Sequence, residues 1–399
     1  MRNRKPLPNE NASIMITPQD AKPTGDRLDH AEGIRLYGIT WDDPRGWGPL
    51  AEVGRAFAAT PAGREVTVRW DIQPLDGFES RSVSELAGRY DLLNLDHPHI
   101  GQAVSTGALR PVGDIADEFL GPSLASYRWA GQVWAVPVDA ACQVAAYRAG
   151  SVAAPPRSYT DVLALARQRP VAASLVGVHA LMALLTLLAQ HAAPLTGNPA
   201  GNWPEPHRFD PAALQLRELA AVCLPESLDW NPLQLLNAMG EGRCDYAVFT
   251  FAYINFQNDG VRFAAVPSPD GMGTRGAVLG GTGLAVSAQC LHPASALDYA
   301  RFAGSADVQR SLWPRHGGQP ASRAAWDTLE QTDPFYRDLR PAIENAWIRP
   351  RYAGWNERQS RAGQIVNNWL RQPNADVPSL RAELEELWIR TGMQTGTNT

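Results

Sequence analysis

Apolar and polar residues follow a regular strand and helix pattern in the first structured part of the chain. Apolar side chains occupy every second position of residues 65–72, which is the period of a β-strand. Two short apolar runs, 34–39 and 90–95, predict further strands, and helical spacing appears at 50–57 and 83–86. The order strand, helix, strand, helix, strand is typical of a doubly wound α/β sheet.

A long apolar segment, residues 131–148, lies near the middle of the sequence and reads GQVWAVPVDAACQVAAYR. It predicts a strand at 133–138, a break at Pro137 and Asp139, and a second strand after the break. Two strands nearly in line, with a polar kink between them, suit a chain that leaves one lobe and enters another. We therefore expect residues 139–143 to form a hinge crossover beside a cleft.

Alternating strand and helix patterns continue after this crossover and predict a second α/β lobe. The expected strands are 171–176, 244–250 and 263–266, and the expected helices are 179–190, 211–222 and 232–239. Residues 277–288 then predict a strand that returns to the first lobe, and the rest of the chain is predicted to be mostly helical. The predicted organisation is a disordered leader 1–32, lobe 1 from 33–140 plus 282–318, lobe 2 from 141–281 plus 319–390, and a tail 391–399.

Length and composition are those of a globular protein with more than one domain. The chain has 399 residues, 44% of them hydrophobic and 19% charged, and its net charge of −5 argues against a nucleic-acid partner. No segment reaches the roughly 18–20 apolar residues of a membrane span, so no membrane insertion is expected. The polar N-terminus lacks an apolar signal-peptide core, which predicts a cytoplasmic location for the chain as written.

The four cysteines match no zinc or redox spacing, and no cofactor is predicted. A Cys223–Cys244 disulfide stays open at this point.

The first group of candidate ligand-binding residues lies between the first strand and the first helix. The group comprises Trp41, Asp42, Asp43, Arg45 and Trp47. Carboxylates and a guanidinium give directional hydrogen bonds to hydroxyl or carboxylate groups, and an indole can stack on the apolar face of a sugar. The Gly48-Pro49 pair suits the first turn of the following helix. The alternative is a capped, salt-bridged loop with its tryptophans in the core.

Polar residues at other predicted strand ends and crossovers form the second group of candidates. Asp96 and His97 follow a strand, and hydrogen bonding to an organic ligand is favoured over a metal site because no distant further ligand is evident. Asp139 and Gln143 at the crossover either reach the ligand or satisfy the hinge backbone. Gly281, next to Thr282, either permits a close backbone approach or marks a bulge.

Five segments in register resemble the extracellular solute-binding proteins of ABC transporters, the group that includes maltose-binding protein. They are YDLLNLDHPHIGQAVSTGALRPV, GQVWAVPVDAACQVAAYR, MGEGRCDYAVFTFAYINF, GGTGLAVSAQCLHPASALDYARFAGSADVQRSL and GGQPAS, and the resemblance covers about residues 33–390. It implies a two-lobe periplasmic binding protein type II fold with interlobe hinge crossovers that closes on a ligand. It also implies a periplasmic location, an ABC permease as partner if the chain is exported, and no catalytic residues; we expect a monomer.

The same resemblance implies further site residues. Phe251 and Tyr253 are similar to the stacking aromatics of the family, with simple core packing as the alternative. Arg351, Tyr352 and Trp355, with Arg349 beside them, stand in a loop that faces the cleft in this family; a solvated loop is the alternative.

The leading hypothesis is therefore a non-catalytic solute-binding protein for a small polar ligand. Thirteen tryptophans favour a sugar, whereas Arg45, Arg315 and Arg351 leave an organic carboxylate possible. The alternatives are a cytoplasmic enzyme on the same scaffold, with Asp42, Asp43 or His97 as general acid or base, and a cytoplasmic ligand sensor.

Overall fold

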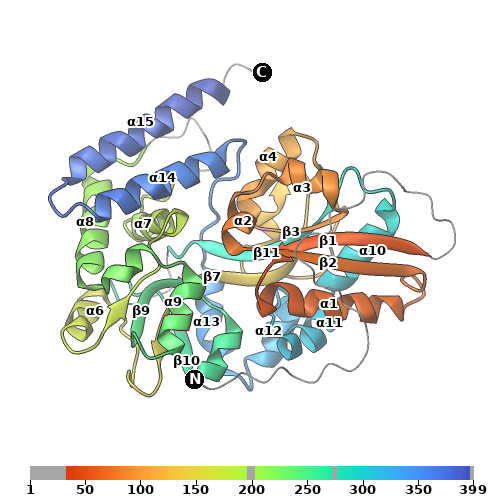
Figure 1. Ribbon diagram of the computed structural model, residues 1–399, viewed down its shortest axis with the longest axis horizontal. Coiled ribbons are helices and arrows are strands. Elements are labelled where there is room, and N and C mark those ends of the chain that lie inside the picture. Colours follow the sequence, from red (N-terminus) through yellow and green to blue (C-terminus); the bar gives the residue numbers. More distant parts are fainter. Residues whose placement is uncertain (1–32, 196–202, 272–275, 396–399) are drawn as a thin grey trace.

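The computed structural model describes residues 33–195, 203–271 and 276–395 (Figure 1). The predicted leader 1–32 lies outside the described residues, as do residues 396–399 of the predicted tail. The strands are β1 (Ile34–Trp41), β2 (Val66–Gln73), β3 (Leu92–Leu95), β4 (Leu109–Arg110), β5 (Arg128–Trp129), β6 (Gln132–Val133), β7 (Val136–Arg148), β8 (Val171–Ala172), β9 (Tyr246–Phe251), β10 (Val261–Ala265) and β11 (Leu279–Ser287).

Helices surround these strands on both sides (Figure 1). They are α1 (Pro44–Ala58), α2 (Leu75–Ser80), α3 (Val83–Arg89), α4 (Ile100–Ser105), α5 (Ser123–Ser126), α6 (Tyr159–Ala166), α7 (Val178–Gln190), α8 (Pro206–Val222), α9 (Pro232–Gly240), α10 (Pro293–Gly304), α11 (Ala306–Leu312), α12 (Arg323–Leu329), α13 (Pro334–Glu344), α14 (Trp355–Leu370) and α15 (Val377–Thr395). Short 3₁₀ helices lie at His97–His99, Pro225–Leu228, Ile254–Asp259 and Pro314–His316. Within the described ranges, no helix combines the length and the apolar composition that crossing a membrane requires.

Nine of these strands form one mixed sheet in the order β2-β1-β3-β11-β7-β9-β8, with β4 added to β11 and β10 added to β7, and β5 and β6 form a separate two-stranded sheet. The three N-terminal strands are parallel, whereas β11 runs antiparallel to both β3 and β7. The predicted α/β class is confirmed. Figure 1 shows β1 to β3 with α1 and α10 in one half of the molecule, and β9 with α6 to α9, α14 and α15 in the other.

Strand β7 crosses from one half of the sheet to the other without a break. Residues 136–142 of β7 pair with β11, and residues 143–148 pair with β9 and β10. The predicted interruption at Pro137 and Asp139 is therefore wrong, although the predicted passage between the two halves is present. The strand continues through Asp139 because Arg45 compensates its buried carboxylate.

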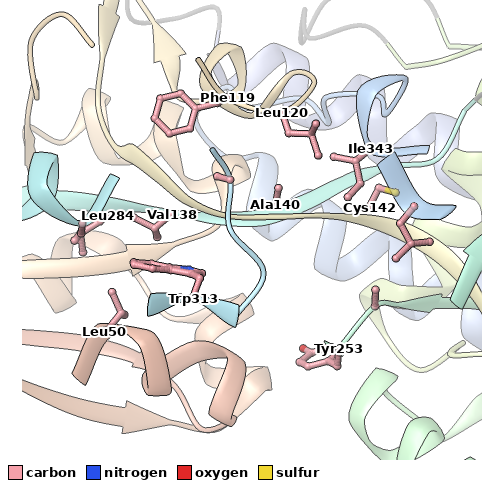
Figure 2. Packing of buried hydrophobic residues seen from close by; sticks show 14 of the residues in the cluster. Leu50, Phe119, Leu120, Val138, Ala140, Cys142, Tyr253, Leu284, Trp313 and Ile343 are labelled. Atoms are coloured by element: carbon pink, nitrogen blue, oxygen red, sulfur yellow. The ribbon is translucent and has the colours of Figure 1, made fainter. Parts of the chain in front are cut away.

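The apolar core extends across this strand. Figure 2 shows Val138, Ala140 and Cys142 in a row along β7, with Trp313 next to Val138. All of these side chains are buried. The core therefore joins the two halves through β7.

Candidate functional site: a cavity between the halves of the sheet

A cavity of about 60 Å³ lies where the two halves meet. From the first half it is lined by the end of β1, the start of α1, helix α2 and Asp96 after β3. From the second half it is lined by α7, the start of α9, β9 and the residues that follow it, with β11 and Arg349 between the two. The predicted cleft residues that line this cavity are Trp41, Arg45, Asp96, Phe251, Tyr253, Gly281 and Thr282.

The N-terminus of α1 positions Arg45. Helix α1 begins at Pro44, because the carboxylate of Asp43 accepts a hydrogen bond from the Arg45 backbone N–H at 2.8 Å and caps the helix. The predicted start at Gly48-Pro49 is therefore wrong by one turn. The predicted loop 41–47 is instead the end of β1 followed by the first turn of α1.

Arg45 connects the two halves of the molecule. Its Nε and Nη2 donate to the two carboxylate oxygens of Asp139 at 2.9 and 2.5 Å, and its Nη1 donates to the carbonyl of Ala252 at 2.6 Å. The guanidinium also lies 4.7 Å from the centre of the Tyr253 ring. Both charged side chains are almost fully buried. Asp139 itself lines a smaller gap next to the cavity.

A second buried charge pair lies at the end of β3. The Arg349 guanidinium donates from Nη2 to Asp96 Oδ2, and His97 Nδ1 lies 2.9 Å from Asp96 Oδ1. Burial alone would raise the pKa of Asp96, but the attraction of Arg349 and His97 outweighs it and holds the pKa well below its usual range. Burial lowers the pKa of His97 to about 4 against the opposing attraction of Asp96. Asp96 is therefore ionised and His97 neutral at pH 7.

Glu79 and His179 face each other across the cavity from opposite halves. Glu79 Oε1 on α2 lies 3.4 Å from His179 Nε2 on α7. Burial raises the pKa of Glu79 to about 8 against the opposing attraction of Arg349, and the negative charges of Asp96 and Asp76 add to the increase. Burial lowers the pKa of His179 to about 3. The pair is therefore not a conventional ion pair at neutral pH.

Several buried polar atoms of the cavity residues have no hydrogen-bond partner within the described parts of the chain. They are Trp41 Nε1, both ring nitrogens of His179, Thr282 Oγ1 and Arg349 Nε. Such orphaned groups are costly in a protein interior unless a further molecule hydrogen-bonds to them. Aromatic side chains lie beside them: Trp41 and Phe78 pack with ring centroids 5.1 Å apart, and Phe251 packs edge-on against His179. This combination of orphaned polar atoms and aromatic rings suits a small polar ligand.

Gly281 allows two backbone segments to meet at the cavity. Its φ is +89°, and a Cβ built there would lie 2.3 Å from the Asp139 carbonyl oxygen. The pairing of β11 with β7 shifts register immediately afterwards, between Thr282 and Gly283. The bulge and the close backbone approach, weighed as alternatives from the sequence, are both present.

The remaining predicted residues lie outside the cavity. Asp42 is exposed, Asp43 is the buried cap of α1, and Trp47 is half-buried on that helix. His97 is buried behind Asp96. Gln143 is buried in β7, where its N–H donates to the Val278 carbonyl at 2.9 Å.

The loop residues after Arg349 have structural contacts instead. Arg351 donates from Nη1 to the carbonyls of Ala125, Ser126 and Arg128. The Tyr352 hydroxyl accepts a hydrogen bond from Arg358, and Trp355 is fully buried in the core of the second half. Arg349 alone of this loop reaches the cavity.

Sequence reasoning missed Phe78, Glu79 and His179. Phe78 and Glu79 lie on α2, a helix of six residues that is too short for a clear period. His179 is the second residue of α7, whose apolar sequence predicts a buried helix and hides the one polar side chain at its start. A histidine and a phenylalanine–glutamate pair about 100 positions apart carry no local signal of proximity.

The described residues contain no group of three or more His, Cys, Asp or Glu side chains arranged to hold a metal ion. Cys223 and Cys244 are free thiols, so the disulfide left open from the sequence is absent.

Comparisons with known proteins agree with this architecture. The sequence model of the bacterial extracellular solute-binding protein family matches residues 54–333, which is more than half of the chain. Its extracellular description agrees with the location implied by the sequence resemblance and gives no support to a cytoplasmic one. A search of curated proteins found no match.

Solved structures of two-lobe binding proteins are similar along nearly the whole chain. Maltose-bound MalE3 of T. maritima is 17% identical, with a TM-score of 0.76 over 90% of this chain and 100% of that one. A solute-binding protein of Thermotoga lettingae with bound α-D-tagatose is 15% identical, with a TM-score of 0.74 over 90% and 100%. One from Agrobacterium vitis with bound D-mannitol is 15% identical, with a TM-score of 0.72 over 92% and 100%. At such identities the structural similarity shows the fold alone. The match to the family model shows the family: the chain belongs to the bacterial extracellular solute-binding proteins, which are binding proteins and not enzymes.

Proposed function

We propose that this protein is the solute-binding component of an ABC importer, and that it binds a small sugar or polyol in the cavity between its two halves. The observation that carries the proposal is the set of orphaned polar atoms on Trp41, His179, Thr282 and Arg349 around one cavity lined with aromatic rings. A hydroxyl group both donates and accepts hydrogen bonds, so a polyhydroxylated ligand satisfies such a mixed set, while its C–H face packs on the aromatic rings.

The ligands of the similar structures support the same class. Maltose, tagatose and mannitol are all neutral and carry many hydroxyl groups. An organic carboxylate, the second candidate, would need a cation in the cavity to receive it. Arg45 is already paired with Asp139 and Arg349 with Asp96, which disfavours an acidic ligand.

Binding is proposed to close the two lobes on the ligand. We take the lobes to be residues 33–140 plus 282–318 and 141–281 plus 319–390, with β7 and β11 as the connecting strands. Contacts that reach from one lobe to the other, such as Arg45 to the Ala252 carbonyl and Glu79 to His179, would then form on closure and stabilise the bound state. A ligand-loaded, closed protein would be the form that the permease recognises.

A thermal-shift screen against neutral sugars, polyols and organic carboxylates tests the ligand class. A ligand present at 100 times its Kd adds about 2.7 kcal/mol of stability, which is readily detected. We expect a neutral sugar or polyol to raise the melting temperature and to be recovered chemically unchanged by mass spectrometry. Small-angle scattering with and without that ligand measures closure as a fall in the radius of gyration.

A pair of variants ties the binding to the cavity. Phe251→Ala removes a cavity ring and is expected to abolish the shift, whereas Leu291→Ala, on an exposed surface residue, is expected to retain it. A screen in which only carboxylates stabilise the protein, or in which Phe251→Ala binds as well as the unaltered chain, would refute this assignment.

A further inference from the structure

Carboxylates outnumber the available cations around the cavity. Arg349 is paired with Asp96, and Arg45 with Asp139. Glu79 lines the same cavity, and within the described ranges it has no arginine or lysine at ion-pair distance; its partner is His179 at 3.4 Å. When Glu79 ionises, its negative charge is therefore the one cavity charge without a guanidinium at ion-pair distance among the described residues, and Arg349 attracts it only from farther away.

His179 does not supply the missing positive charge. It is almost fully buried at the start of α7, and burial together with the nearby positive charge of Arg349 keeps its imidazole neutral at physiological pH. Neither ring nitrogen makes a hydrogen bond of good geometry among the residues that the structure describes, although Nε2 lies 3.4 Å from Glu79 Oε1. The cavity thus presents the carboxyl group of Glu79 from one wall and the neutral imidazole of His179 from the facing wall.

Aromatic and apolar side chains complete the same walls. Trp41, Phe78 and Phe251 line the cavity, and the faces of such rings attract cations. Leu75 and Met182 also line this cavity, and the Glu79 side chain keeps 23% of its surface exposed. An ammonium group in the cavity would meet both a carboxylate and aromatic rings.

We infer that the cavity selects a sugar or polyol that carries a protonated amino group, and that Glu79 is the residue that distinguishes this ligand from its neutral and acidic analogues. The inference rests on the proposed function, because it specifies the ligand class of the same cavity. A carboxylate ligand would add a further negative charge beside Glu79 and Asp96, whereas an ammonium ligand balances Glu79 and donates hydrogen bonds to it.

The preference for an amino ligand can be measured as the release of a proton from Glu79 on binding. Burial raises its pKa to about 8, Asp96 and Asp76 act in the same direction, Arg349 opposes them, and His179 is neutral. Glu79 is therefore mostly protonated at pH 7 without a ligand. An ammonium ligand stabilises the carboxylate, so binding releases a proton, whereas a neutral sugar leaves the proton in place.

Isothermal titration calorimetry with matched ligands tests the inference. Glucose, galactose and mannose are each compared with their 2-amino and 6-carboxylate derivatives, at pH 7 in two buffers of different ionisation enthalpy. For at least one of the three sugars, we expect the amine to bind at least tenfold more tightly than the parent hexose, the acid to bind most weakly, and close to one proton to be released with the amine.

Glu79→Gln keeps the shape of the side chain and removes its charge. We expect this variant to bind the parent hexose within threefold of the unaltered protein, to lose the preference for the amine and to release no proton. Glu52→Gln, on a carboxylate of similar exposure in α1 that pairs with Arg55, is the matched control and is expected to keep the preference.

The outcomes separate this inference from the proposed function. Tighter binding of a parent hexose than of its amine, or an amine preference that survives in Glu79→Gln, overturns the inference and leaves sugar binding in place. Binding of none of the nine compounds contradicts both.

Discussion

Arg45 and Asp139 lie 94 positions apart in the sequence and form a buried two-pronged ion pair. The pair attaches the first turn of α1 to β7 near its start, and the third guanidinium nitrogen donates to the Ala252 carbonyl, just after β9. It explains how β7 carries a charged residue through the core without a break. It also means that the charge of Arg45 is compensated by the protein and is not available to an acidic ligand.

Breaking this ion pair is expected to cost much of the stability of the fold. Asp139→Asn leaves the Arg45 guanidinium buried without a counter-charge, so the free energy of unfolding should fall by about 3–5 kcal/mol. Urea denaturation measures it. The control is Asp307→Asn, which removes a partner from the exposed Asp307–Arg310 pair and should cost less than about 1 kcal/mol. A loss in Asp139→Asn no larger than in this control would show that the buried pair is not a stabilising element.

Adding a methyl group at Gly281 is expected to be more destabilising than at Gly131, another glycine with positive φ. Gly281→Ala combines an unfavourable φ of +89° with a Cβ only 2.3 Å from the Asp139 carbonyl oxygen. Gly131→Ala has a similar φ of +76° but no heavy atom within 4 Å. Denaturation should therefore show a loss of about 1 kcal/mol for Gly131→Ala and of about 3 kcal/mol or more for Gly281→Ala. Equal losses would mean that β11 and β7 can separate at no cost.

The hydroxyl of Thr282 is expected to serve the ligand and not the fold. Thr282→Val keeps the shape and removes an oxygen that has no partner within the described chain, so stability should change by less than about 1 kcal/mol. The Kd for the ligand found by screening should rise about tenfold, which is the contribution of one hydrogen bond.

Thr250 offers a matched control for this experiment. It is also buried in the sheet, on β9, and its Oγ1 likewise has no partner in the described ranges, but it does not line the cavity. Thr250→Val should leave the Kd unchanged. If both variants weaken binding equally, the effect comes from the sheet and not from a contact with the ligand.

Stability is expected to fall as the pH drops below 6.5. Burial lowers the pKa of His97 and of His99 to about 4 and that of His179 to about 3, from an ordinary value of 6.5. Between the ordinary value of 6.5 and the lowered pKa of each histidine, the unfolded chain binds a proton at that histidine and the folded chain does not. Each group then removes up to about 1.4 kcal/mol of unfolding free energy per pH unit as the pH decreases.

Urea titrations between pH 7 and pH 4 measure this loss. His179→Gln should flatten the curve by the contribution of one group, while His292→Gln, at an exposed position, should leave its slope unchanged. A His179→Gln curve parallel to that of the unaltered protein would contradict a neutral, buried His179.

Much of the fold follows from patterns that lie within a few residues of one another. The alternation at 65–72 predicts β2, the apolar run at 179–190 predicts α7, and the predicted strand 244–250 overlaps β9 closely. These patterns are informative because burial of one face of an element is decided by the period of its side chains. Five segments in register were enough to indicate the family. They indicate it because the five segments follow one another along this chain in the same order as in the family.

The tertiary structure alone decided which polar residues share the cavity. Asp139 interrupts an apolar run in the sequence, but Arg45 neutralises it from another helix, so the strand continues. Trp355 and Phe251 look alike as candidates, yet one is buried in a helical core and the other lines the cavity. Glu79 and His179 meet only because α2 and α7 pack from opposite halves. Local periodicity carries no information on contacts between residues a hundred positions apart; these depend on the packing of whole elements.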